Sequence, residues 1–500
     1  MPAYDQLNQA AGLIIPEIIL IATVCIMFLS APFLVTETGQ SSPGLRHRWG
    51  ILTLLSLGCA ILAWLNSPLT HGAVGPFEVD ALAWYVRGVI LITGVLLTLI
   101  VWDQTSDSIA AEVFACLLAV LAGVSFVGVA NDLIGIFLGL ELVSIPTYIL
   151  LYLGRQDWHS REATIKYFLL SIFSSALVLF GLAWVYGLAG STNLAAIASI
   201  SSISGTVTAH KMLTVALVMI LCGVSFRLTA VPFHFYAPDV FQGTTPSAAA
   251  MLSFLPKLVG FVALLQILPV CYGSLQPANW LPAPPVQLLV AVMAVGTMTI
   301  GNVMALRQKS LLRLLAWSSI SHGGYMLVGL AVADGSAEGT GLAAILFYLP
   351  VYGVMSIGVF AAISAAGTLA RPLRSLEDIH GLSQTRPALA LTMTICLFGM
   401  SGLPPTGGFL GKLNLFVAAW KVNTELSRFL AIVLAINAVI AATYYLRVIG
   451  LMYFEKSVVS TERETGQIAP IAGLICAAAT LLTFLIPQQL WDAAVSAAGL

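Results

Sequence analysis

The sequence predicts an all-α polytopic membrane protein. Of its 500 residues, 59% are hydrophobic and only 9% are charged, whereas a soluble domain carries about 25% charged residues. Mean hydropathy is +0.96, and apolar windows of about 20 residues, long enough to cross a bilayer, recur along the chain. The net charge of −1 leaves no basic face that would indicate nucleic-acid binding.

Fourteen apolar segments are expected to form transmembrane helices. Their connections are short, so residues 1–500 are expected to form a single transmembrane domain. The approximate ranges are 13–35, 49–66, 80–101, 110–130, 132–153, 165–189, 211–231, 247–270, 285–305, 311–333, 341–366, 388–416, 426–453 and 468–487.

Basic residues of the loops predict how the chain lies in the membrane. The opposite face holds only Lys211, Lys421 and Arg428, whereas alternate loops, with the adjoining helix ends, hold most of the others, among them Arg46, Arg155, Arg307, Arg371 and Arg463. Cytoplasmic loops carry an excess of lysine and arginine. Both termini are therefore expected on the outer (periplasmic or lumenal) side, as an even number of helices requires.

Cysteine spacing gives no indication of a metal or iron–sulfur site. None of the seven cysteines forms a Cys-x-x-Cys pair or another ligand spacing. Isolated thiols in apolar segments are usually small hydrophobic residues. We therefore expect no cofactor or metal in this chain.

Four of the charged residues inside predicted spans are candidates for function. Glu141 lies near the middle of the otherwise uncharged stretch 133–153, and Lys257 follows Pro256 near the middle of its span. Arg227 and Lys412 lie in the seventh and twelfth spans. A charge at the bilayer centre costs at least about 2.5–3.5 kcal/mol, so such residues usually mark ion or proton pathways. Pro256 is expected to kink or loosen the helix beside Lys257.

The seventh and twelfth spans are expected to be broken. In the seventh, a break is expected near Val231–Pro232, continuing through Pro238, and the twelfth contains "SGLPPTGG" at 401–408. Non-helical backbone at membrane depth is tolerated only inside protein or beside a watery cavity. Two breaks five helices apart predict two repeats, 110–270 (helices 4–8) and 285–453 (helices 9–13), which are inverted because each has an odd number of helices.

Polar residues near these charges have the makeup of a proton relay. Hydroxyls and a histidine recur at helical spacing on two spans: Glu141, Ser144 and Tyr148 on the fifth, and Ser318, His322 and Tyr325 on the tenth. His234 follows the first break and is a possible further relay group. Arg227 differs, because a guanidinium effectively never loses its proton. It is expected to act as a fixed countercharge, and Arg227 and Lys257 are expected to be the partners of Glu141 within the first repeat.

Structural explanations stand beside the functional one. Each buried charge can be half of a static ion pair, and serine or tyrosine partners can simply join helices. Arg87 is expected to reach the interface or to pair with Asp80 or Glu78.

Several segments together resemble one family. The chain contains "NDLIGIFLGLELVSIPTYIL" (131–150), "EATIKYFLLSIFSSALVLFGLAWVYG" (162–187), "SFRLTAVPFHFYAPDVFQGTTPSAAAMLSFLPKLVG" (225–260), "LLAWSSISHGGYMLVGL" (314–330) and "FGMSGLPPTGGFLGKLNLF" (398–416). In the same order, these resemble the antiporter-like subunit N, or subunit 2, of complex I (NAD(P)H:quinone oxidoreductase) and its photosynthetic relatives. Sodium/proton antiporter and membrane-hydrogenase relatives typically have Pro-Asp-Ala-His where this chain has Pro-Asp-Val-Phe, which favours the N type.

The resemblance implies fourteen helices, two inverted five-helix repeats and a hydrated polar axis. Glu141 matches the family's fifth-helix glutamate, Lys257 its eighth-helix lysine, His322 its tenth-helix histidine and Lys412 its twelfth-helix lysine. Arg227 stands where the family usually has lysine.

The resemblance also implies a function: proton translocation by a membrane subunit of a complex I-type NAD(P)H or ferredoxin:quinone oxidoreductase, in a bacterial inner or thylakoid membrane. FMN, iron–sulfur clusters, the electron donor and quinone would belong to partner subunits, both membrane and peripheral. The partners of this chain itself would be those subunits, lipid and protons. Alternatives are a subunit of a multi-subunit Na⁺/H⁺ antiporter or membrane hydrogenase, and a structural scaffold with static buried ion pairs.

Overall fold

A computed structural model describes residues 3–34, 44–67, 72–155, 157–199, 207–272, 284–333, 340–367, 373–456 and 468–499. Arg371 and Arg463 lie outside these residues. The described chain is nearly all α-helical, as the composition predicts. Its α-helices are α1 (Ala3–Leu13), α2 (Ile15–Ser30), α3 (Leu45–Asn66), α4 (Ala81–Gln104), α5 (Ala110–Val129), α6 (Leu133–Gly154), α7 (Trp158–Ala189), α8 (Leu194–Ser199), α9 (Val207–Leu228), α10 (Ala237–Gly243), α11 (Pro246–Cys271), α12 (Pro284–Leu306), α13 (Leu311–Ala331), α14 (Thr340–Ala366), α15 (Leu382–Thr385), α16 (Pro387–Ser401), α17 (Gly407–Lys421), α18 (Glu425–Phe454), α19 (Ala469–Leu485) and α20 (Gln488–Ala498).

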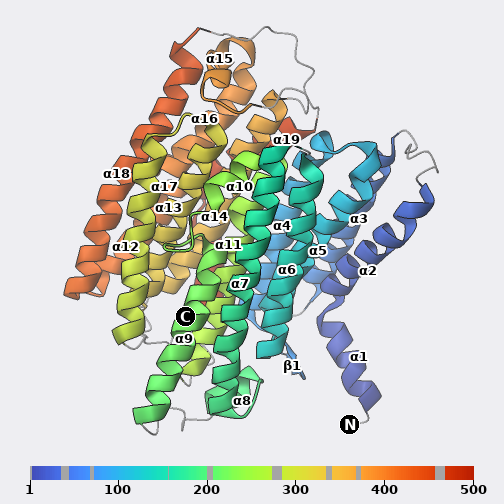
Figure 1. Cartoon of the computed structure of the whole chain (residues 1–500), viewed down its shortest axis with the longest axis vertical. Coiled ribbons are helices and arrows are strands. Elements are labelled where there is room, and N and C mark those ends of the chain that lie inside the picture. Colours follow the sequence, from blue (N-terminus) through green and yellow to red (C-terminus); the bar gives the residue numbers. More distant parts are fainter. Residues whose placement is uncertain are drawn as a thin grey trace.

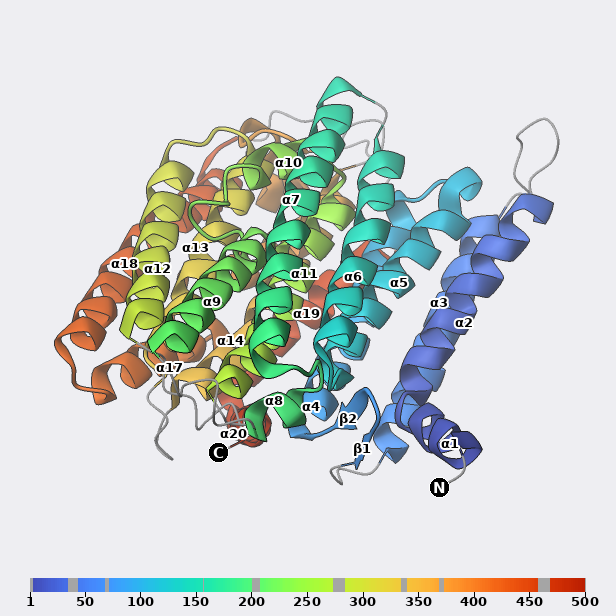
Figure 2. The ribbon, with the colours of Figure 1, turned by 60° about the horizontal axis from the view of Figure 1, so that its bottom comes forward.

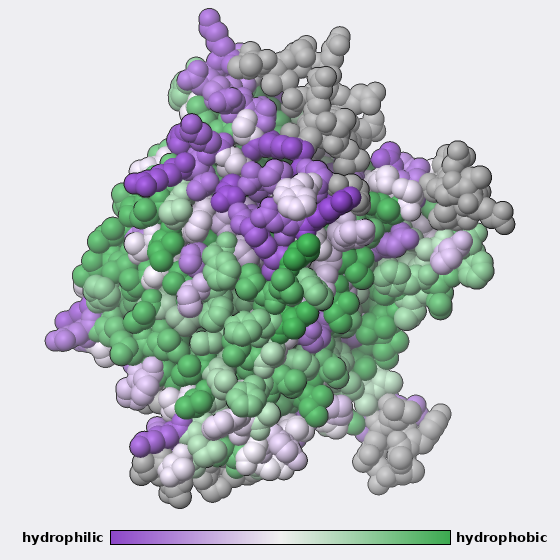
Figure 3. Space-filling view, viewed as in Figure 1, coloured by the Kyte–Doolittle hydropathy of each residue, from purple (hydrophilic) through white to green (hydrophobic). Residues whose placement is uncertain are grey.

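The long helices stand side by side in one bundle. α2 and α3 lie at one edge and α18 at the opposite edge, while α1 and α20 lie at the same end (Figures 1 and 2). An apolar belt surrounds the middle of the visible face, and hydrophilic residues gather at its upper end (Figure 3). This surface is typical of a bundle that lies across a bilayer.

Within the described residues, eleven helices are long and apolar enough to cross a membrane, or twelve if α19 and α20, bent by 83°, form one span. Every predicted span overlaps a helix. The remaining two predicted spans fall on α13, whose 21 residues include polar side chains, and on the shorter pair α16 and α17. The polytopic helical class is confirmed, whereas the number fourteen stays a prediction.

Both expected helix breaks are present. α9 ends at Leu228, residues 229–236 form turns, and Pro238 lies in the first turn of α10. α16 ends at Ser401, followed by Gly402 in the left-handed conformation (φ 81°), and α17 begins at Gly407. Pro256, in contrast, lies within α11, which continues through it as one helix.

A short β-hairpin was not predicted from the sequence. Strands β1 (Gly72–Val74) and β2 (Phe77–Val79) pair antiparallel, with Ala73 opposite Glu78. The hairpin lies at the same end of the bundle as α1 (Figure 2).

Small residues bring the central helices into close contact. A Cβ at Gly324 of α13 would lie 2.5 Å from the backbone nitrogen of Met298 in α12, and one at Gly323 would lie 2.8 Å from the carbonyl oxygen of Leu228. Glycine at helix interfaces lets backbones approach in this way. α13 is thereby held against α12 and against the broken end of α9, with its polar side chains inside the bundle.

Candidate functional site: buried cations and hydroxyls across the bundle

Glu141 and Arg227 form an ion pair between α6 and α9. Arg227, 2% exposed, donates from Nη2 to Glu141 Oε1 at 3.3 Å and from Nη1 to Ser144 Oγ at 2.8 Å. The hydroxyl of Ser175 on α7 donates to the same Glu141 oxygen. The Glu141 side chain is 25% exposed on the surface of this chain. The pair therefore links three helices, and its carboxylate lies at the edge of the chain and not at its centre.

Lys257 lies fully buried on α11 and has a neutral partner. Its Nζ donates to Ser319 Oγ at 2.7 Å, and Ser319 also accepts from the Tyr352 hydroxyl at 2.9 Å. None of the ion pairs between described residues involves Lys257. Burying an unpaired ammonium is costly, so this arrangement favours a lysine that can exist without its proton.

His322 connects two tyrosines on either side of α13. Its Nδ1 lies 2.7 Å from the hydroxyl of Tyr348 on α14, and its Nε2 lies 3.0 Å from the hydroxyl of Tyr445 on α18. Tyr445 also hydrogen-bonds to Ser318. The ring centroid of His322 lies 4.7 Å from that of Tyr352, the group that reaches Lys257 through Ser319. A histidine that can accept on one nitrogen and donate on the other can pass a proton between such hydroxyls.

Lys412 binds the end of the broken helix. Its Nζ donates to the carbonyl oxygens of Met400 at 2.8 Å and Ser401 at 3.0 Å, both in the last turn of α16, and lies 5.0 Å from the ring centroid of Tyr325. The last four carbonyls of a helix lack intrahelical partners, and the helix dipole attracts a cation there. In the part of the chain that the structure describes, Lys412 also lacks a carboxylate partner.

Most of these groups form a row that is joined partly by hydrogen bonds and partly by ring contacts alone, and that is separate from the Glu141–Arg227 pair. Lys257, Ser319, Tyr352 and His322 follow one another through the contacts above, and the Tyr325 ring, 5.7 Å from His322, continues the row to Lys412. No hydrogen bond between described residues joins this row to the Glu141–Arg227 pair. The sequence suggested Arg227 and Lys257 as partners of Glu141, and only Arg227 contacts it.

His234 does not join the row. Its Nδ1 is buried and has no partner among the described residues, and its ring packs 5.7 Å from that of Trp317. The sequence also missed two members of the row, Ser319 and Tyr352, and the two tyrosines that bind His322, Tyr348 and Tyr445. Tyr348 and Tyr352 lie four residues apart on one apolar helix. This spacing, which places both hydroxyls on one helix face, was the signal from which they could have been found.

The expected partner of Arg87 was wrong. Arg87 on α4 forms a two-bond ion pair with Glu17 on α2, at 2.8 Å from both Nε and Nη2, and not with Asp80 or Glu78. Side chains of both partners are at most 1% exposed. Ser125 donates to the same carboxylate at 2.5 Å. This pair lies outside both predicted repeats and joins α2 to α4 and α5.

An ion cluster holds α10 at the hydrophilic end of the bundle. Asp239 accepts from Lys166 Nζ on α7 at 2.7 Å and from Arg313 Nη1 on α13 at 2.7 Å. Burial raises the pKa of Asp239, but the hydrogen bonds and charges of these two cations outweigh it and hold the pKa below its ordinary value. The short helix between the first break and α11 is therefore tied to both halves of the chain.

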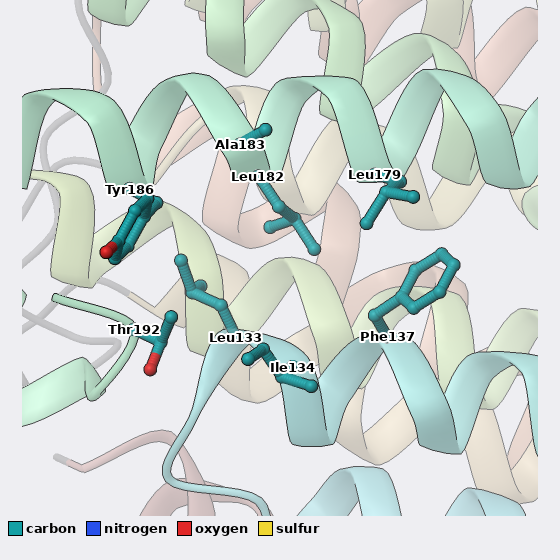
Figure 4. A pocket seen from close by; sticks show the side chains of 8 residues that line it. All are labelled: Leu133, Ile134, Phe137, Leu179, Leu182, Ala183, Tyr186 and Thr192. Carbon is teal, nitrogen blue, oxygen red and sulfur yellow. The ribbon is translucent and has the colours of Figure 1, made fainter.

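A separate apolar cavity of about 440 Å³ lies between α6 and α7. Leu133, Phe137 and Leu182 line it, with Tyr186 and Thr192 toward one end (Figure 4). None of the buried ionisable residues described above lines it. Among the described residues, no group of three or more His, Cys, Asp or Glu could hold a metal ion.

A family model described as "NADH:quinone oxidoreductase/Mrp antiporter, TM" matches residues 130–441, which contain both breaks and every member of the row. The chain belongs to this family. The resemblance found in the sequence is thus confirmed, and within the family the relatives are subunit N and subunit 2 proteins.

Relatives in this family cover most of the chain. NADH-quinone oxidoreductase subunit N of Trichlorobacter lovleyi is 39% identical over 391 residues, 78% of this chain and 77% of the relative. Subunit N of Rhodospirillum rubrum is 32% identical over 489 residues, 97% of this chain and 96% of the relative. NAD(P)H-quinone oxidoreductase subunit 2 of Trichodesmium erythraeum is 34% identical over 451 residues, 89% of this chain and 82% of the relative.

Solved structures have the same fold. A chain of respiratory complex I from Thermus thermophilus, solved with bound Aureothin, superposes with a TM-score of 0.78 at 26% identity, over 95% of this chain and 98% of that one. A chain of the archaeal membrane-bound sulfane sulfur reductase gives 0.81 at 22% identity, over 97% of both chains, and so shares the fold.

Proposed function

We propose that this chain is a proton-translocating membrane subunit of a complex I-type NAD(P)H or ferredoxin:quinone oxidoreductase. The observation that carries the proposal is the row from Lys257 to Lys412: two buried lysines, each bound to neutral oxygens, with His322 and hydroxyls between them. Family membership supports the assignment to this enzyme. Electron transfer would take place in partner subunits that hold FMN, iron–sulfur clusters and quinone.

Each member of the row has a role in the proposal. Protons enter from the cytoplasmic side near Lys257, pass His322 and leave on the outer side near Lys412. Glu141 and the fixed charge of Arg227 set the electrostatic state at the start of the row. Glu141 acts on Lys257 through its charge, because a nearby charge shifts the proton affinity of a buried group.

The proposal includes the finer architecture expected from the sequence. Fourteen spans would comprise two inverted repeats, 110–270 and 285–453, with both termini on the outer side of a bacterial inner or thylakoid membrane. The two helix breaks support the repeats, because each break lies beside a buried cation: Arg227 at the first and Lys412 at the second. Two of the basic loops expected on the cytoplasmic side are also in contact. Arg374 Nη2 lies 3.8 Å from Asp157, and Asp157 also forms an ion pair with Arg155.

The test compares lysine variants in the intact complex. Lys257→Met and Lys412→Met keep side-chain length and remove the titrating group, and the exposed Lys421→Met is the matched control. Protons pumped per quinone reduced should fall in the first two and stay unchanged in the control. A double Lys257→Met, Lys412→Met variant that assembles and pumps normally would refute proton translocation through these lysines. It would favour the alternative that this chain is a structural scaffold.

Two further measurements test the role of Glu141 and the antiporter alternative. Glu141→Gln should lower pumping with normal assembly; unchanged pumping would remove its gating role. Sodium-dependent transport without any electron donor, in a preparation lacking peripheral iron–sulfur subunits, would instead favour the antiporter of the same family.

A further inference from the structure

A small cavity near the β-hairpin is lined by oxygen-bearing side chains. Its volume is about 50 Å³, and its polar lining residues are Glu78, Asp80, Asn131 and Gln266. The cavity lies away from the row of lysines and belongs to no part of the proposed proton pathway.

Two amide oxygens at this cavity are buried without a donor. Asn131 is 5% exposed, and its Oδ1 has no hydrogen-bond partner among the described residues. Gln266 Oε1 is also buried and unpartnered, while its Nε2 donates to the Gly128 carbonyl at 3.0 Å, which fixes the orientation of the amide. Each unsatisfied buried acceptor costs about 1–3 kcal/mol. Both atoms therefore indicate an electropositive ligand.

The walls of the cavity are held by the surrounding backbone. The Asn131 backbone donates to the Pro76 carbonyl at 2.8 Å and accepts from Leu194 N at 3.2 Å. Asp80 accepts from Ala83 N at 2.7 Å and so caps the first turn of α4. The hairpin, α4, α5, α8 and α11 thus meet around one cavity.

We propose that this cavity binds a hard cation, with Ca²⁺ as the best match, between Glu78, Asp80, Asn131 and Gln266. Carboxylate and amide oxygens are the ligands Ca²⁺ prefers, and it accepts irregular arrangements of about 6–8 oxygens completed by water. Mg²⁺ demands a near-ideal octahedron and keeps several of its waters, so it is seldom held by a site built mainly of protein oxygens. Since roughly 10–15 Å³ of such space is enough to hold one water molecule, the cavity has room for the ion and water beside it.

Such an ion would link the hairpin to the helix that carries Lys257. Gln266 follows Lys257 on α11 by nine residues, about 14 Å along the axis. The bound cation would hold this end of α11 against α4 and α5 without touching the proton pathway.

The test measures binding of radiolabelled Ca²⁺ to the intact purified complex after washing with a chelator. The double variant Glu78→Gln, Asp80→Asn removes both charges, and asparagine at position 80 still caps α4. It should lose one bound Ca²⁺ per complex, or bind it at least about tenfold more weakly, because affinity follows the number of charged ligands. The exposed Glu425→Gln is the control and should bind as the natural protein does.

A second variant keeps the test decisive if the first assembles poorly. Asn131→Asp has the same shape and adds a charged ligand, so it should bind Ca²⁺ more tightly. Unchanged Ca²⁺ binding in both variants would show that only water fills the cavity and would overturn the proposal. Loss of Na⁺ binding with Ca²⁺ binding intact would overturn the assignment to a divalent ion.

Discussion

Replacing Glu17 by glutamine should strongly destabilise the N-terminal part of the bundle. The pair with Arg87 has two hydrogen bonds of 2.8 Å, and its side chains are 0% and 1% exposed. Glutamine keeps the shape and removes the charge, which leaves a guanidinium buried without a countercharge. Breaking a buried pair by removing one partner costs about 3–5 kcal/mol.

Removing both partners should restore most of this stability. With Glu17→Met and Arg87→Met together, no buried charge remains, and apolar replacement of a buried pair is often neutral or stabilising by about 1–4 kcal/mol. The hydrogen bond from Arg87 Nη2 to the Leu13 carbonyl at 2.7 Å is lost in this variant. Recovery should therefore fall short by about 0.5–1.5 kcal/mol.

The assay is denaturant unfolding of the purified complex in mild detergent, compared between the natural protein, Glu17→Gln and the double variant. Asp157→Asn is the control, because its carboxylate is 37% exposed and surface pairs contribute only about 0.2–1 kcal/mol. A double variant as unstable as Glu17→Gln would refute the reasoning, since the loss would then come from packing and not from an uncompensated charge.

Three further predictions concern other parts of the chain. Asp239→Asn should loosen α10 and lower pumping, with assembly retained, because its pairs with lysine and arginine are half-exposed. Gly408→Ala should prevent assembly, since its Cβ would lie 2.0 Å from a backbone oxygen of α16, whereas Gly187→Ala, with nothing within 4 Å, should be silent. Tyr352→Phe removes the hydroxyl that reaches Ser319 and should slow pumping without affecting stability.

The Asp239 prediction also has a pH dependence. Because its pKa is held below the ordinary value, the ion cluster stabilises the folded chain above the ordinary carboxyl pKa, and this contribution is lost as pH falls through the lowered pKa. Wild-type and Asp239→Asn complexes should therefore differ in unfolding midpoint at neutral pH and converge in acid. If the difference in unfolding midpoint stayed constant from neutral to acid pH, the ion pairs of Asp239 with Lys166 and Arg313 would be excluded as its cause. Normal assembly of the Gly408→Ala variant would contradict the second prediction. An unchanged pumping rate in Tyr352→Phe would contradict the third.

The sequence predicted the helices and the breaks because both depend on local chemistry. Length and hydropathy locate helices such as α6 and α11, prolines mark the break after α9, and a cluster of proline and glycine marks the break after α16. Four buried charges were found for the same reason, since a charge inside an apolar run is visible without any knowledge of packing.

Partners could not be predicted in the same way, because they depend on how distant helices meet. Arg87 was assigned to nearby acids, yet its partner is Glu17, seventy residues earlier in the chain. Lys257 was expected to lie near Glu141, but the close approach of α13 at Gly323 brings Ser319 to it instead. Tyr348 and Tyr352 look like ordinary core residues until α14 is packed against α13.

The contact between Lys412 and the end of α16 depends on whether the lysine is charged. When protonated, its ammonium donates to two carbonyls at the end of α16 and meets the negative end of that helix, an interaction of about 0.3–2 kcal/mol. Once the proton leaves, that attraction disappears, and the non-helical segment at 402–406 is held less firmly. In the proposed translocation, the break would therefore be held firmly while Lys412 carries a proton and less firmly each time that proton leaves.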